Sequence, residues 1–197
     1  LYPFYRAYGD VLINGRMNGQ YRIALNENES AWLEEDKLKT VFFANYEPNH
    51  LFGLKTSASA EKTRIVFAGK KPVPISIHEF NDRLELTLYY VDGFDENYTL
   101  DPNHSIIENI TWSQPAPDTL LFKIYFKKDA ALWGHAYDFD GQNLIIDLMH
   151  RPVLTPAKNA PLKGARILLD AGHSPRRTVP YDGAVGPTGY LEYEANL

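Results

Sequence analysis

The sequence predicts a mainly β protein whose final residues open a domain of a different class, α/β. Aromatic residues, which favour strands, are abundant: the 197 residues include 13 tyrosines and 10 phenylalanines. Many short runs alternate apolar with polar residues, as half-buried strands do. Near the end the pattern changes. The unbroken apolar run from Ile167 to Leu169 is typical of a parallel strand that is covered on both faces.

The first part of the chain, residues 1–43, is expected to form small barrel-like hairpins. Short apolar runs and polar turns alternate there, at 10–13, 14–15, 18–19, 21–25, 26–30 and 31–33. Asn14-Gly15 and Asn18-Gly19 both have the composition of two-residue hairpin turns. A strand with Trp32, an acidic turn at 34–36 and then Leu38 resemble the C-terminal half of a bacterial Src-homology-3-like barrel. The alternative is a pair of β-hairpins packed on the next domain.

The central part, residues 60–152, is expected to form a small β-sandwich after a loop at about 44–62. Leu84, Leu86 and Leu88 alternate with polar residues in the clearest strand pattern, which spans 83–91. Other runs of this type lie at 63–67, 75–80, 106–112, 119–126, 134–138 and 143–149. Asp140-Gly141 predicts a hairpin turn. Residues 153–165, which include Pro156 and Pro161, are expected to be a semi-rigid linker.

Composition excludes several function classes. The net charge of −5 leaves no basic stripe for nucleic-acid phosphates. No apolar run approaches the roughly 18 to 20 residues of a membrane-spanning helix. The absence of cysteine excludes disulfides and thiol catalysis, so any metal site must use histidine and carboxylate ligands. Because the chain starts with Leu1 and not with methionine, we expect that a signal peptide has been removed.

The residues that are the best candidates for a metal site lie in the last thirty-two positions. Asp170-Ala-Gly-His173 follows the apolar run, at the strand end where α/β sheets place their ligands. A glycine-rich loop, 183–189, comes next, and Glu192 opens a segment that is expected to be helical. Histidine and glutamate are two common zinc ligands.

These residues resemble the opening of the zinc-dependent N-acetylmuramoyl-L-alanine amidases, cell-wall hydrolases with a D-x-G-H … G-A-x-G-x-x-G-x-x-E signature. The resemblance implies that residues 166–197 begin a catalytic domain and that His173 and Glu192 bind Zn²⁺. Glu192 is preferred to Glu194 because 192–197 align with the family's E-K-D-x-N-L. Asp170 is expected to support His173 by a hydrogen bond or to cap the strand end.

The same resemblance implies a second histidine ligand and a glutamate general base. Both are expected beyond Leu197, so no catalytic residue is expected within these 197 residues, which would be inactive alone. One departure is the stretch 174–182, which separates His173 from the glycine-rich loop and contains Arg176 and Arg177. These arginines would suit the carboxylates of wall stem peptides.

Residues 60–152 resemble the AMIN-type domains that precede amidase domains and bind the wall, with 64–67 and 143–152 as the opening and closing strands. The expected activity is therefore hydrolysis of the amide between N-acetylmuramic acid and L-alanine in peptidoglycan, in the periplasm or at the cell surface. Two alternatives remain open. One is a non-catalytic peptidoglycan-binding or regulatory module, and the other is a zinc peptidase that cuts within the stem.

The other histidines and the aromatic residues offer weaker candidates for a site. His50, His78, His104, His135 and His150 show no paired ligand spacing and are expected to be surface or packing residues. Tyr89, Tyr90, Trp112 and Trp133 could line a glycan groove, or else belong to the core and sheet edges.

Overall fold

The computed structural model describes residues 9–39, 46–103, 105–165, 167 and 184–191. The chain divides into two units, Leu1–Arg151 and Pro152–Leu197. The described residues are mainly β, with no α-helix and no closed barrel among them, so the predicted mainly β class is confirmed. In this described part, no helix is long and apolar enough to span a membrane.

A small antiparallel sheet lies at the start of the first unit. Its strands are β1 (Leu12–Met17), β2 (Gln20–Ala24) and β3 (Ser30–Glu34), followed by the 3-10 helix η1 (Glu35–Lys37). Asn18 and Gly19 form the predicted β1–β2 turn, with φ values of 51° and 75°, the left-handed region that such turns require. These described strands form an open sheet and not a barrel.

The turn predicted at Asn14-Gly15 is wrong. Both residues lie inside β1, where the register with β2 shifts between Ile13 and Gly15. Such a β-bulge accommodates one extra residue without ending the strand. The Asn14 Oδ1 atom accepts a hydrogen bond of 2.8 Å from Nε of Arg22, which holds the bulge against β2.

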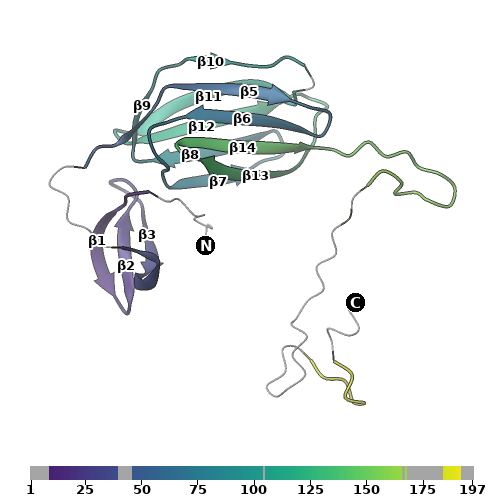
Figure 1. Cartoon of the computed structure of the whole chain (residues 1–197), viewed down its shortest axis with the longest axis horizontal. Coiled ribbons are helices and arrows are strands. Elements are labelled where there is room, and N and C mark those ends of the chain that lie inside the picture. The colour runs from purple at the N-terminus through teal and green to yellow at the C-terminus, as the bar shows by residue number, and fades with distance from the viewer. Residues whose placement is uncertain (1–8, 40–45, 104, 166, 168–183, 192–197) are drawn as a thin grey trace. The chain divides into compact units, whose positions relative to one another are not determined.

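Two larger sheets follow in the same unit (Figure 1). The five-stranded sheet has the order β10 (Tyr98–Thr99), β5 (Gly53–Ala58), β6 (Lys62–Ala68), β14 (Asn143–His150), β13 (Leu132–Asp140). The four-stranded sheet has the order β11 (Ile107–Ala116), β12 (Thr119–Phe126), β8 (Arg83–Tyr89), β7 (Ile75–Glu79). A short parallel pair, β4 (Asn49–Leu51) and β9 (Val91–Phe94), completes the set.

The inward faces of these two sheets form one hydrophobic core. Leu84, Leu86 and Leu88 of β8 are fully buried, as their alternation predicts. Phe67 from the five-stranded sheet and Phe122 from the four-stranded sheet meet edge to face, with ring centroids 4.9 Å apart. The two sheets thus pack as a β-sandwich around contacts between residues that are far apart in the sequence.

Two expectations about strand limits are wrong. The loop expected at 44–62 contains β4 and β5, and β5 pairs along its whole length with β6. Its single large inward side chain, Leu54, gives too weak a pattern for prediction. The strand expected at 83–91 is split at Tyr90, whose φ of 60° breaks the extended chain between β8 and β9.

The strands expected to open and close the central part, within 64–67 and 143–152, are neighbours in the structure. They belong to β6 and β14, which pair antiparallel with Ile65 opposite Ile146. Asp147 on β14 accepts two hydrogen bonds from the Arg64 guanidinium, at 2.7 and 2.8 Å, and one from the Lys62 ammonium at 2.7 Å. These cations lower the pKa of Asp147 to about 2.

The second unit is described only in part. Residues 157 and 160 form an isolated antiparallel bridge, as do Val185 and Leu191. Of the predicted parallel strand at 167–169, only Ile167 is among the described residues. The expected start of an α/β domain therefore stays a prediction.

Candidate functional site

The residues predicted to hold zinc, His173 and Glu192, and the supporting Asp170 lie outside the described residues. The loop before Glu192 is described from Ala184 to Leu191. Its backbone closes on itself: the Gly186 amide donates to the Tyr190 carbonyl at 2.8 Å, and the Gly189 amide donates to the Gly186 carbonyl at 2.9 Å. Within the described part of the chain, no three His, Asp or Glu side chains are arranged to hold a metal ion.

The four aromatic residues considered for a glycan groove do not gather on one surface. Tyr89 and Tyr90 are buried, and Trp112 packs edge to face against Phe94 with ring centroids 5.6 Å apart. Of the four, only Trp133 is strongly exposed, at 62%. Tyr89, Tyr90 and Trp112 therefore mainly serve packing, and Tyr89 also lines the cleft described next.

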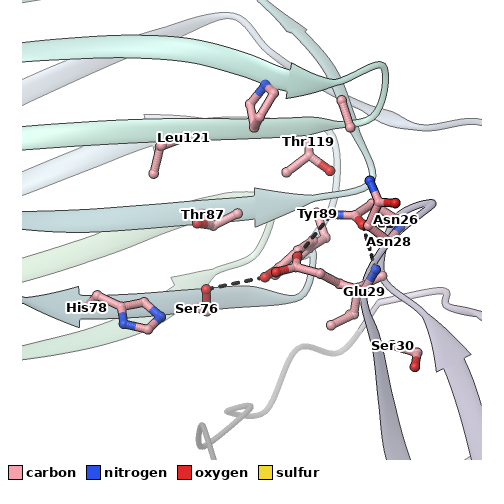
Figure 2. A pocket seen from close by; sticks show the side chains of 13 residues that line it. Asn26, Asn28, Glu29, Ser30, Ser76, His78, Thr87, Tyr89, Thr119 and Leu121 are labelled. Atoms are coloured by element: carbon pink, nitrogen blue, oxygen red, sulfur yellow. Dashed lines mark hydrogen bonds between the residues drawn. The ribbon is translucent and has the colours of Figure 1, made fainter.

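A cleft of about 700 Å³ offers the clearest candidate site (Figure 2). One wall is the turn between β2 and β3, and the other is the outer face of the four-stranded sheet. The lining residues are mostly polar: Leu25, Asn26, Asn28, Glu29, Ser30, Ser76, His78, Thr87, Tyr89, Pro115, Ala116, Thr119 and Leu121.

Strand alternation places the sheet wall of this cleft. Because Leu86 and Leu88 point into the core, Thr87 between them points outward. Thr87 lies opposite Ser76 of β7 and opposite Leu121 of β12, so the three side chains form a row across the sheet. The alternation in the sequence places Ser76 and Thr87 on the outer face of the sheet. It does not show that a turn from another sheet faces them.

Hydrogen bonds fix the turn wall. Oδ1 of Asn26 accepts from the backbone amides of Asn28 and Glu29, both at 2.8 Å, which is an Asx turn. Nδ2 of Asn26 also donates to the Glu29 carboxylate at 2.9 Å. Figure 2 shows Asn26, Asn28 and Glu29 together beside Tyr89.

Two tyrosines join the small sheet to the sandwich. The buried Tyr90 hydroxyl donates to the carbonyl of Ala24 and accepts a 3.2 Å bond from the amide of Leu12. The Tyr89 hydroxyl lies 3.4 Å from Ser76 Oγ at the base of the cleft. Burial raises the pKa of Tyr89, so this hydroxyl stays neutral and keeps its proton as a hydrogen-bond donor.

The charges in the cleft disfavour an anionic ligand. Among its described lining residues, Glu29 is the one carboxylate, and there is no lysine or arginine. An anionic ligand would therefore meet no permanent positive charge. The cleft suits a neutral ligand that is recognised by hydroxyl and amide groups.

A second polar cluster surrounds His50, at the pair of strands β4 and β9. Its Nδ1 lies 2.8 Å from Asp92 Oδ1, and its Nε2 lies 2.7 Å from Asp95 Oδ1. Both ring nitrogens donate only when the imidazole is protonated. The hydrogen bonds to Asp95 and Asp92 accordingly raise the pKa of His50. We call this arrangement of His50 between Asp92 and Asp95 the His50 clamp. From the sequence, His50 was expected to be a surface or packing residue, because both aspartates are more than forty positions away.

The His50 clamp predicts a pH-dependent stability. Because the pKa of His50 is higher in the folded chain, its stabilisation is complete below the unfolded value of about 6.5 and is lost as the pH rises through the raised folded pKa. At pH 6 we expect His50→Asn to lower the free energy of unfolding by about 1–2 kcal/mol, since two charge-assisted hydrogen bonds are lost from a partly exposed site.

Urea denaturation at several pH values between 6 and 9 checks this prediction. The difference between the wild-type chain and His50→Asn should shrink as the pH rises. A difference that stays constant over this range would show that the clamp does not depend on the charge of His50. His135→Asn serves as the control, since His135 contacts one carboxylate, Glu79, at 3.2 Å.

Comparison with known proteins found no relative of this chain. No protein-family model, curated protein or solved structure matches this chain. The resemblance to amidases therefore rests on the residues from Asp170 to Leu197 and on their order.

Proposed function

We propose that this protein is a zinc-dependent N-acetylmuramoyl-L-alanine amidase. It hydrolyses the amide between N-acetylmuramic acid and L-alanine in peptidoglycan, outside the cytoplasm. The observation that carries the proposal is the motif order: Asp170 and His173 after an apolar run, then the glycine-rich loop at 183–189, then Glu192. Histidine and carboxylate are the donors that catalytic zinc sites use when no cysteine is available.

In this proposal His173 and Glu192 hold the zinc ion. Bound zinc lowers the pKa of a water molecule to about 7 and polarises the scissile carbonyl. In the glycine-rich loop that precedes Glu192 in the sequence, an antiparallel bridge joins Val185 to Leu191. Leu191 itself is buried.

The β unit would serve to bind the wall. The polar cleft between the β2–β3 turn and the four-stranded sheet supports this role, since it offers many hydrogen-bonding groups and little charge. The same observation favours a second candidate function, a non-catalytic peptidoglycan-binding or regulatory module. In that case the motif at 170–192 would be retained without activity.

Digestion of purified peptidoglycan by the full-length natural protein tests these functions. An amidase releases stem peptides with a free N-terminal L-alanine and leaves muramic acid without alanine, which mass spectrometry detects. Zinc chelation should abolish the release and added Zn²⁺ should restore it. Cleavage within the stem would identify a zinc peptidase. Wall binding without any release, retained after deletion of 152–197, would identify the binding module.

A further inference from the structure

The cleft at the β2–β3 turn has the size and the shape of a ligand site. Its volume of about 700 Å³ lies within the range of roughly 300–1,000 Å³ that is common for small-molecule sites. Its two walls come from different sheets, and the buried Tyr90 hydroxyl ties the small sheet to the sandwich through Ala24 and Leu12. A ligand would therefore meet groups that are already in place, which lowers the cost of binding.

Several polar groups in the cleft are not used by the fold. The side chains of Asn28, Ser30 and Thr87 make no hydrogen bond to another residue in the described part of the chain. Hydroxyl and amide groups of this kind both donate and accept hydrogen bonds. Water satisfies them in the free protein, and a ligand that presents hydroxyls and amides can replace that water at little cost.

The charge of the cleft favours the glycan strand of peptidoglycan over the stem peptide. Stem peptides carry free carboxylates, and in the cleft they would meet the Glu29 carboxylate with no lysine or arginine among the lining residues. The glycan strand is neutral, because its amino sugars are acetylated and its lactyl carboxyl is held in the amide to alanine. Apolar contacts from Leu121 and Pro115 suit the C–H faces of sugar rings and the acetamido methyl group.

We propose that this cleft binds the glycan strand of peptidoglycan through its N-acetylated sugars and does not bind the stem peptide. The inference rests on the proposed wall function and names the part of the wall that is recognised. The site is composite: Asn28 and Ser30 come from the small sheet, and Thr87 comes from the sandwich. Glycan binding therefore requires both sheets.

Titration of the 197-residue chain with an oligomer of N-acetylglucosamine tests the proposal, by calorimetry and by amide chemical shifts. We expect saturable binding with shifts centred on the β2–β3 turn and on β7 and β8. The double variant Asn28→Ala/Thr87→Val should weaken binding by at least fivefold. Thr111→Val is the matched control, because Thr111 lies on β11 of the same four-stranded sheet but does not line the cleft.

Three results would overturn the proposal: no saturable binding of the oligomer, equal binding by the double variant, or saturable binding of a free stem tetrapeptide at the same residues. Unchanged thermal unfolding of both variants will show that they are folded. Amidase activity is measured separately, on intact wall and with the full-length natural protein, because these 197 residues are expected to be inactive alone. Glycan binding without activity would refute the amidase and leave the cleft assignment standing, whereas activity without glycan binding would refute the cleft alone.

Discussion

Replacing His173 by alanine in the full-length natural protein is expected to reduce zinc-dependent wall hydrolysis by at least about 1000-fold. A bound zinc ion contributes several kcal/mol to transition-state stabilisation, and about 4 kcal/mol corresponds to a factor of 1000 in rate. Loss of one of its proposed ligands removes that contribution together with the bound metal. Glu192→Ala should have a similar effect. Release of stem peptides and the zinc content of the purified protein are the two measurements.

His135→Ala is the matched control for this experiment. His135 contacts Glu79 on the sandwich and lies far from the motif in the sequence, so both activity and zinc content should be unchanged. A His173→Ala protein that keeps its zinc and its activity would contradict the assignment. If Glu192→Ala loses zinc but His173→Ala keeps it, Glu192 is a zinc ligand and His173 is not.

Phe122→Ala is expected to lower the free energy of unfolding of the β unit by about 3–5 kcal/mol. The ring is fully buried between the two sheets, with centroids 4.9 Å from Phe67 and 5.3 Å from Phe94. Its removal leaves a cavity and ends two edge-to-face contacts. Because the free energy of unfolding of a domain is only about 5–15 kcal/mol, this loss would remove a large part of the stability of the β unit.

Urea denaturation monitored by tryptophan fluorescence measures this loss. Phe80→Ala is the control: that ring is 41% exposed, and its contact with the Arg83 guanidinium, 4.2 Å from the ring centroid, contributes about 1 kcal/mol or less. Similar losses in the two variants would mean that Phe122 does not occupy the centre of the core.

Local patterns predicted much of the fold because their causes are local. The alternation in 119–126 gives β12 with the same limits, and Asn18-Gly19 forms the turn that its composition favours. Where a local signal was weak or ambiguous, the prediction was wrong. Residues 53–58 become a strand because β6 lies beside them, and Asn14-Gly15 stays within β1 because β2 pairs with β1 on both sides of the bulge.

The candidate sites divide in the same way. The motif from Asp170 to Glu192 is a matter of residue order, so the sequence can suggest it without a structure. The cleft and the His50 clamp are different, because each joins residues that are distant in the chain: Asn28 with Thr87, and His50 with Asp95. No periodicity marks such pairs.

The β class and most strand positions follow from the sequence alone, since side-chain alternation and turn chemistry act within a few residues. The amidase-like motif is likewise visible in the residue order. Only the tertiary structure decided which strands are neighbours, such as β6 and β14, and which polar groups face one cleft. Those choices depend on burying the apolar faces of two sheets against each other, which is a property of the whole unit and not of any segment.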